Sequence, residues 1–308
     1  MGRPIRPRFP SVSNSRKARV TIANDVPSFL VSKRRPHLAP WRTAGRVSEE
    51  QRTADDVVRE TGWVFNNETG EHLTLAEFVA TGTTEVGYFC HFLGLFWGEH
   101  AEGRTFVEIG SGIGRMTAAL THHYSTVVAC DLDGAFLERC RETVSQHGRI
   151  DRLRTVHMAD GRSLATVDDA SADVVFSYIT LQHCEHDTAV ALIHEALRAV
   201  KPGGRVALNF RTWTGRDALL FPLGALVRFT WRVVPSRIRP PRLVTRIGWQ
   251  ANRLGPEEVV TMLQRQYPDL ALTLVFQSDQ RSSTLKSPIP VHRLIGVHPS
   301  HWWLVVQR

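Results

Sequence analysis

Three glycines in one short turn are the first residues of this chain whose spacing points to chemistry. Gly110, Gly112 and Gly114 follow an apolar run and precede a helical pattern. Because glycine carries no Cβ, such a turn lets a ligand lie close against the backbone. The G-x-G-x-x-G fingerprint of dinucleotide-binding proteins does not fit, since Arg115 stands where its third glycine would fall. The turn therefore predicts a ligand other than a dinucleotide, with a tight turn that binds nothing as the alternative.

Acidic residues close to the ends of three predicted strands supply polar partners for such a ligand. Glu108 lies near the end of the first strand, Asp131 ends the second and Asp160 ends the third. Carboxylates at the last two positions can accept ribose hydroxyls and the exocyclic amine of an adenine. Glu108 would repel a pyrophosphate and attract an amino group. Together with the glycine turn, the three acids predict a cradle for an adenosine that carries an uncharged or cationic tail.

A histidine in the loop after the fourth predicted strand is a candidate catalytic base. The segment "LQHCEHD" contains His183, and a neutral imidazole there can take a proton from a hydroxyl acceptor near pH 7. The alternative is a structural histidine that orders Gln182 or a backbone carbonyl. His183 and His186 could also ligate a metal with Asp187, but Asp187 is better used as the N-cap of the next helix. No metal site is therefore predicted.

The elements that must position these residues alternate between strands and helices, which predicts a parallel sheet covered on both faces. In such a sheet a ligand binds beyond the carboxyl ends of the strands, where the glycine turn and the acids would meet. "KPGG" is expected to end a helix, with Gly203 and Gly204 both in left-handed conformations. The predicted helices are 134–147, 187–200 and one that opens at 255. The predicted strands are 105–109, 126–130, 153–158, 172–177, 205–210, 270–276 and 301–308.

Four regions are expected along the chain. Residues 1–55 form a basic tail outside the fold; their first forty residues carry nine Arg and Lys against one acid, which indicates disorder or sequence upstream of a misassigned start codon. Residues 56–104 are predicted to form a helical, aromatic cap over the carboxyl end of the sheet. Residues 105–308 form the main domain, with a substrate-lid insertion at 211–253.

Composition excludes several classes of protein. No run of eighteen apolar residues occurs in the 308, so no membrane-spanning segment is predicted. The four cysteines are scattered, which argues against a disulfide framework or a zinc site and fits a reducing compartment, so a cytoplasmic location is expected. The net charge of +8 comes mostly from arginine, a bias that favours a GC-rich bacterial genome.

As a set, these motifs resemble those of the class I S-adenosylmethionine-dependent methyltransferases. "VEIGSGIGRMT" is similar to their glycine-rich signature, "VVACDLD" to their second strand and "ADGRSL" to their adenine-binding loop. "ADVVFSYITLQHCEH" and "ALRAVKPGGRVAL" resemble the segments around the fourth and fifth strands. The resemblance covers about 86–210 and implies a Rossmann-like, mostly parallel sheet of seven strands in the order 3-2-1-4-5-7-6. The last strand is antiparallel, helices cover both faces, and S-adenosylmethionine is the cofactor.

The resemblance also implies roles for individual residues. Glu108 would hold the methionine amino group, Asp131 the ribose, and Leu132 would lie against the adenine. Tyr178, just past the fourth strand, would approach the sulfonium. The remaining cofactor-binding positions are the turn residues Gly110, Ser111, Gly112 and Gly114, and the adenine-edge residues Asp160 and Gly161.

The expected reaction is methyl transfer to an oxygen of a small molecule, sugar or glycolipid, with His183 as the base. An RNA or protein methyltransferase and a non-catalytic S-adenosylmethionine-binding protein are the alternatives. "FSYITLQH" departs from the Asn/Asp-Pro-Pro-aromatic box of nucleic-acid amino methylases, so a nucleic-acid partner is not expected. No obligate protein partner is inferred.

The segment 211–253 raises a separate expectation. It carries nine arginines against a single acid, Asp217, interleaved with aromatic residues. One interpretation is an ordinary lid with solvated arginines. The sharper hypothesis is peripheral contact with an anionic membrane and a lipid-linked acceptor, and single-stranded RNA ranks behind lipid.

Overall fold

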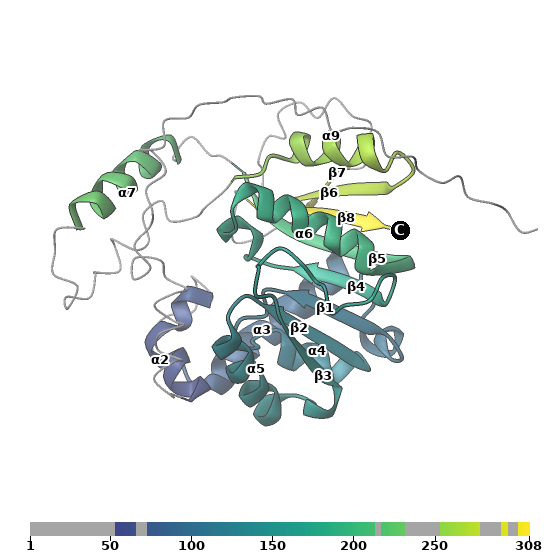
Figure 1. Cartoon of the computed structure of the whole chain (residues 1–308). Helices are drawn as coiled ribbons and strands as arrows, with labels where there is room; N and C mark the ends of the chain where they lie inside the picture. Colours follow the sequence, from purple (N-terminus) through teal and green to yellow (C-terminus); the bar gives the residue numbers. More distant parts are fainter. Residues whose placement is uncertain (1–52, 66–72, 213–216, 232–252, 278–290, 295–300) are drawn as a thin grey trace, which may run out of the picture. The chain divides into compact units, whose positions relative to one another are not determined.

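The computed structural model describes residues 53–65, 73–212, 217–231, 253–277, 291–294 and 301–308 (Figure 1). The described strands form one sheet in the order β3-β2-β1-β4-β5-β8-β6-β7. Their bounds are β1 Thr105–Ile109, β2 Thr126–Asp131, β3 Leu153–His157, β4 Ala172–Ser177, β5 Val200–Arg211, β6 Ala271–Gln277, β7 Val291–Leu294 and β8 His301–Gln307.

Strand pairing confirms the predicted order for seven of these strands. β1 to β5 pair in parallel, whereas β8 runs antiparallel to both β5 and β6. The short strand β7 pairs in parallel with β6 and adds an eighth strand at the edge, which the sequence did not predict.

Strand β5 begins at Val200, so the "KPGG" turn lies inside it rather than before it. Gly203 has a φ of 79°, as expected, but Gly204 is not left-handed, and that prediction was wrong. A Cβ on Gly204 would lie 2.9 Å from the carbonyl oxygen of Asp173. Close approach of the neighbouring backbone, and not a positive φ, is therefore what requires glycine at this position.

Helices cover both faces of the sheet. α6 and α9 pack on one face, and α3, α4 and α5 pack on the other (Figure 1). The described helices are α2 Ala54–Phe65, α3 Leu75–Phe92, α4 Thr117–His123, α5 Gly134–His147, α6 His186–Ala199, α7 Asp217–Trp231 and α9 Pro256–Gln266. Short 3₁₀ turns lie at Gly98–Ala101 (η3), Ile150–Arg152 (η4) and Leu181–His183 (η5).

The alternation of side chains along β1 divides its residues between these two layers. Val107 and Ile109 face α6 and α9, whereas Phe106 faces α4. Glu108 points to the same face as Phe106, since successive side chains of a strand alternate. A carboxylate is thereby brought under the first turn of α4, next to the buried side chain of Thr117.

The region predicted as a helical cap contains the helices α2 and α3, and α2 begins at Ala54, two residues before residue 56. The last turns of α3 pack on the α4 face of the sheet through Val86 and Phe89. Its middle turn meets the glycine turn, because Glu85 forms an ion pair with Arg115 at 2.5 Å. In the described residues, α3 therefore packs on a face of the sheet, and its middle turn lies next to the glycine turn.

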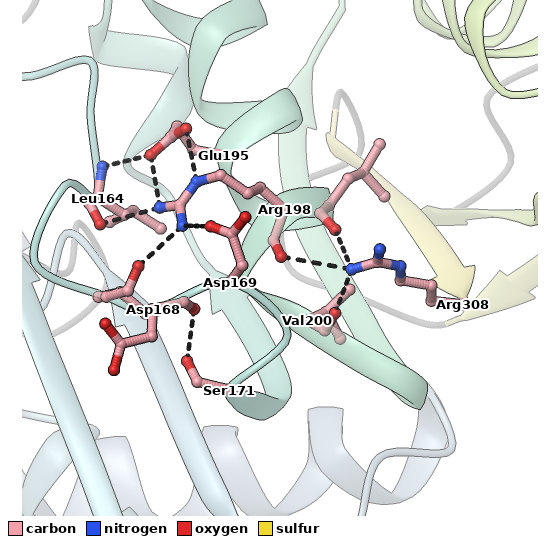
Figure 2. Close-up of polar contacts among 10 residues, drawn as sticks. Leu164, Asp168, Asp169, Ser171, Glu195, Arg198, Val200 and Arg308 are labelled. Atoms are coloured by element: carbon pink, nitrogen blue, oxygen red, sulfur yellow. Dashed lines mark hydrogen bonds and ion pairs between the residues drawn. The ribbon is translucent and has the colours of Figure 1, made fainter. Parts of the chain in front are cut away.

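The loop between β3 and β4 is tied to α6 by Arg198 (Figure 2). The guanidinium of Arg198 donates to Glu195 at 2.9 and 3.0 Å and to Asp169 at 2.5 Å. Glu195 also accepts the N–H of Leu164 at 2.8 Å, so both ends of the carboxylate are engaged. The pKa of Arg198 is raised mainly by Glu195. This network fixes the far part of the loop that opens with the predicted adenine-binding residues.

Candidate functional site

The glycine turn crosses the carboxyl end of β2. Gly110, Gly112 and Gly114 have φ values of 81°, 56° and 89°, a region that L side chains avoid. The N–H groups of Gly110 and Ser111 both donate to the carbonyl oxygen of Cys130, at 2.7 and 3.1 Å. The backbone of the turn is therefore fixed against β2, with its glycines in conformations that only glycine adopts readily.

Glu108 is buried directly beneath this turn. Its Oε2 accepts a hydrogen bond from Thr117 Oγ1 at 2.7 Å. Burial raises the pKa of Glu108 to about 7, and the nearby Arg115 only partly opposes that shift. A cationic ligand group would favour the ionised carboxylate. The observed environment thus fits a site for an ammonium group.

Asp131 ends β2 and holds the turn from the other side. Its two carboxylate oxygens accept the N–H groups of Gly112 at 2.8 Å and Asp133 at 3.0 Å. Burial raises the pKa of Asp131 to about 6. The next residue, Leu132, is 53% exposed and offers an apolar surface beside the carboxylate. A Cβ on Gly161 would lie 3.3 Å from Leu132 Cδ1, so these two predicted adenine-site residues are neighbours.

Asp160 does not end the third strand, as the sequence predicted. β3 ends at His157, and Asp160 lies in the turn that follows. Its Oδ1 accepts the N–H groups of Arg162 and Ser163 at 2.9 and 3.0 Å, which holds the pKa of Asp160 below its ordinary value. The Gly161 N–H donates to the Met158 carbonyl at 2.8 Å. These hydrogen bonds lie within the turn itself. A contact between the turn and adenine stays a prediction.

Tyr178 follows β4 and is buried in an aromatic cluster. Its ring centroid lies 4.6 Å from that of Phe89 and stacks on Trp303 at 5.5 Å and 6°. The geometry gives the ring a packing role on the α4 face. An approach to a sulfonium stays a prediction.

His183 closes the 3₁₀ turn η5 just beyond β4. The Gln182 amide nitrogen lies 3.3 Å from His183 Nε2 and 3.4 Å from the Ile179 carbonyl oxygen. The donor and acceptor roles in this contact depend on the tautomer of the imidazole and the orientation of the amide. The contact is the one expected of a histidine that orders Gln182, and the base role stays a prediction.

His186 begins α6 and does not join His183. Its Nε2 lies 2.6 Å from Glu258 of α9 and its Nδ1 lies 3.2 Å from Asp187, and the pKa of His186 is raised mainly by Glu258. The N-cap of α6 is Glu185, so the prediction of Asp187 as the cap was wrong. Asp187 lies in the first turn, where negative charge is favourable. In the described part of the chain, no group of His, Cys, Asp and Glu is placed to hold a metal ion.

Sequence reasoning missed a polar network behind the glycine turn. Ile179 has a φ of 56°, a conformation that costs a β-branched residue about 1–3 kcal/mol. Its N–H donates to Asn209 Oδ1 at 3.3 Å, and the same oxygen lies 3.0 Å from His301 Nδ1. Next to it, the side chain of Thr180 fills the space above Gly110. The available signal was a lone asparagine in the apolar run "RVALNF".

The two buried carboxyls make the stability of the ligand-free protein depend on pH. The folded pKa values of about 7 for Glu108 and about 6 for Asp131 exceed the ordinary values of 4.5 and 3.8. The folded state then binds more protons, so we expect stability to fall as pH rises from about 4 to about 7. Glu108→Gln should flatten this loss and raise the free energy of unfolding above pH 7 by about 1–3 kcal/mol.

Denaturant unfolding at several pH values measures this effect. Glu138→Gln, which changes an exposed carboxylate on α5, is the matched control and should keep the wild-type profile. If the free energy of unfolding of Glu108→Gln varies with pH as that of the wild type does, the raised pKa of Glu108 would be contradicted.

The match to a family model falls on this site. Residues 107–208 match the family described as a methyltransferase domain. The strand order and the glycine turn agree with the resemblance of the chain to the class I S-adenosylmethionine-dependent methyltransferases.

Two curated relatives align with part of the chain. The chain is 29% identical over 146 residues to phosphoethanolamine N-methyltransferase 1 of Triticum aestivum, covering 47% of this chain and 27% of that protein. It is 35% identical over 107 residues to carboxy-S-adenosyl-L-methionine synthase of Pseudomonas fluorescens (strain SBW25), covering 33% and 43%. The chain thus spans less than half the length of each of these relatives.

Among solved structures, the chain is similar to a magnesium protoporphyrin IX methyltransferase from Synechocystis PCC 6803 with bound SAH. The TM-score is 0.48 at 14% identity, over 82% of this chain and 97% of that one.

Proposed function

We propose that the protein is an S-adenosylmethionine-dependent methyltransferase that methylates an oxygen atom of a small molecule, a sugar or a glycolipid. The observation that carries the proposal is the pair of buried carboxyls, Glu108 and Asp131, on either side of a left-handed glycine turn. Glu108 suits an ammonium group, and Asp131 suits ribose hydroxyls. A pyrophosphate ligand would meet two carboxylates there, which disfavours a dinucleotide.

The chain's own residues offer partners for the amino group, the ribose and the adenine of this cofactor. Glu108 would accept hydrogen bonds from the amino group, and Leu132 would lie against the adenine ring. Asp131 can bind hydroxyls without releasing the turn, because each carboxylate oxygen accepts one backbone N–H and has a further lone pair. When bound, S-adenosylmethionine supplies an electrophilic methyl group on a sulfonium sulfur. The protein's contribution is then to orient the acceptor, an effect of about 7–11 kcal/mol at best.

An oxygen acceptor also has to lose a proton, and His183 is the side chain proposed to take it. It lies three residues after Thr180, which packs on Gly110, so the histidine is held near the glycine turn. A nitrogen acceptor would place less demand on a base.

Incubation of the protein with radiolabelled S-adenosylmethionine and fractionated cell extract tests the acceptor class. Label in the lipid, sugar or small-molecule fraction supports the proposal. Label in RNA or protein would contradict it, and cofactor binding without any labelled product would point to a binding protein.

Binding calorimetry tests the cofactor directly. We expect S-adenosylmethionine and its demethylated product to bind, and NAD and ATP to bind far more weakly. Asp131→Ala should weaken cofactor binding by about 1–3 kcal/mol, the scale of hydrogen bonds to a charged group. The cofactor affinity of Asp131→Asn should lie between those of the wild type and Asp131→Ala, because asparagine keeps an acceptor oxygen.

Asp151→Ala is the control for this series, since Asp151 is a 65% exposed acid outside the site. Its affinity should equal that of the wild type. Tighter binding of NAD, or an unchanged affinity for Asp131→Ala, would refute the assignment.

A further inference from the structure

The membrane contact expected of 211–253 stays a prediction, because residues 213–216 and 232–252 of that segment lie outside the described residues. Among the described helices, none has the length and apolarity needed to span a membrane. Nothing in the described part of the chain shows what would cover the exposed leucines of α7.

Ile179, just beyond β4, adopts a backbone conformation that its side chain disfavours. Among the residues that the structure describes, Ala170 and Ile179 are the two that are not glycine and have a positive φ, and the φ of Ile179 is 56°. A β-branched residue in this region is an outlier. Such a conformation persists only where the surrounding structure holds it, and it is most frequent at functional sites. The contacts that hold Ile179 therefore bear on function.

Asn209 on β5 supplies the contact that holds the Ile179 backbone. Its Oδ1 accepts the Ile179 N–H at 3.3 Å, and its Nδ2 donates to the Trp302 carbonyl oxygen at 3.3 Å. Because both partners are backbone groups with fixed roles, they set the orientation of the amide. The same Oδ1 lies 3.0 Å from Nδ1 of His301, a hydrogen bond when that nitrogen carries the imidazole proton. Two buried side chains, from β5 and β8, thus meet at one backbone N–H beyond β4.

The conformation of Ile179 sets the position of the next residue. Thr180 Oγ1 donates to the Gly110 carbonyl oxygen at 3.4 Å, and the Thr180 side chain occupies the space that a Cβ on Gly110 would need. β4 lies between β1 and β5 in the sheet, so the loop after β4 connects Asn209 with the glycine turn (Figure 1). A change of the Ile179 φ would therefore move Thr180 relative to Gly110.

The place of Asn209 in the sheet also favours a role beyond packing. By alternation along β5, Asn209 shares its face with Ala207, which lies in the apolar layer that contains Phe176 and Trp303. A buried amide there must have its hydrogen bonds satisfied, whereas an apolar side chain has no such requirement. An apolar side chain at position 209 would, however, leave the Ile179 N–H without this acceptor. The contact with Ile179 is thus the reason for an amide at this position.

We infer that Asn209 is a positioning residue of the cofactor site: it holds Ile179 in the left-handed conformation and thereby places the loop 178–183 against the glycine turn. The inference rests on the proposed function, because the ligand whose binding it affects is S-adenosylmethionine. In molecules in which Ile179 relaxes, the turn loses its contact with Thr180. The apparent affinity then falls with the fraction of molecules that keep the binding conformation.

Calorimetry with S-adenosylmethionine tests the role of Asn209. Asn209→Leu removes the acceptor of the Ile179 N–H and should weaken binding by about tenfold. Asn209→Asp keeps an acceptor oxygen and should bind within about threefold of the wild type. Val206→Ala is the matched control, because it removes buried side-chain volume from the same strand. It should lower the free energy of unfolding but leave the cofactor affinity unchanged.

Ile179→Gly separates positioning from a general loss of stability. Glycine adopts a positive φ without strain, so it does not need the Asn209 contact to keep this conformation. The double variant Asn209→Leu, Ile179→Gly should therefore bind the cofactor about fivefold more tightly than Asn209→Leu alone. If Asn209→Leu does not fold, His301→Leu with and without Ile179→Gly gives the same comparison with a smaller loss, because it removes the second contact of Oδ1.

Hydrogen exchange of the cofactor-free protein tests the same contact without a ligand. In Asn209→Leu, peptides that span 178–184 should exchange at least about tenfold faster than in the wild type. Peptides that span 105–109 of β1 are the reference for global unfolding and should exchange at the wild-type rate. Where Asn209→Leu does not fold, His301→Leu takes its place.

Three results would overturn the inference. They are a cofactor affinity of Asn209→Leu within about twofold of the wild type, a loss of affinity that Ile179→Gly does not reduce, and unchanged exchange at 178–184. A wild-type protein that binds no S-adenosylmethionine would instead refute the proposed function. The exchange experiment would still decide whether Asn209 holds the loop.

Discussion

Gly110→Ala should lower the affinity for S-adenosylmethionine by about a hundredfold, and lower the free energy of unfolding by about 2–6 kcal/mol. Two separate costs combine at this position. Gly110 has a φ of 81°, which an alanine adopts only with strain. The new Cβ would also lie 2.2 Å from Thr180 Cγ2 and Oγ1, so either the turn or the loop after β4 must move. Calorimetry and denaturant unfolding measure the two losses.

Gly203→Ala separates these costs, because Gly203 has a φ of 79° and a Cβ added there would meet no atom within 4 Å. The free energy of unfolding of Gly203→Ala should fall by the conformational strain alone, and its cofactor affinity should be unchanged. Thr180→Gly combined with Gly110→Ala removes the clashing side chain and should recover part of the loss. If Gly110→Ala binds the cofactor normally, the turn does not lie against the ligand.

Much of the sheet could be predicted from sequence because its central strands are buried on both faces. Runs such as "TFVEI" and "ADVVFS" give apolar stretches of strand length, and the structure places both within the predicted bounds. Strand β7 is four residues long, which is too short for a periodic signal. The early start of β5 depends on pairing between Val200 and Ala172, which no local pattern encodes.

The candidate site also contains some residues that could be predicted from the sequence and some contacts that could not. Glu108 and Asp131 could be found because both lie at strand ends next to a recognisable turn. The contact of Thr180 with Gly110, and that of Ile179 with Asn209, join residues far apart in the chain. Such contacts follow from the sheet order, since β4 lies between β1 and β5. Asp160 was expected to end the third strand, but the last pair of that strand is Asp131 with His157, and Asp160 lies three residues beyond it in the turn.

The catalytic role proposed for His183 predicts a large effect that a structural role would not give. If the imidazole removes the proton of an oxygen acceptor, His183→Ala should lower turnover by about 10²–10⁴-fold. Cofactor affinity should stay within about twofold of wild type, because His183 lies outside the residues assigned to the cofactor. The acid side of the wild-type pH–rate profile, where the imidazole becomes protonated, should be absent in the variant. Single-turnover assays with the acceptor found in the extract experiment measure these quantities.

Two further variants separate the base role from the ordering of Gln182. Gln182→Ala removes the amide that lies 3.3 Å from His183 Nε2 and should change turnover by less than about tenfold, because the base itself remains. His194→Ala changes a histidine that lies on α6 against Tyr267, outside the site, and should leave turnover unchanged. Normal turnover in His183→Ala, with only the stability reduced, would make His183 a residue that orders Gln182. The acceptor would then have to be one whose proton needs no side-chain base, and a nitrogen nucleophile would replace oxygen in the proposal.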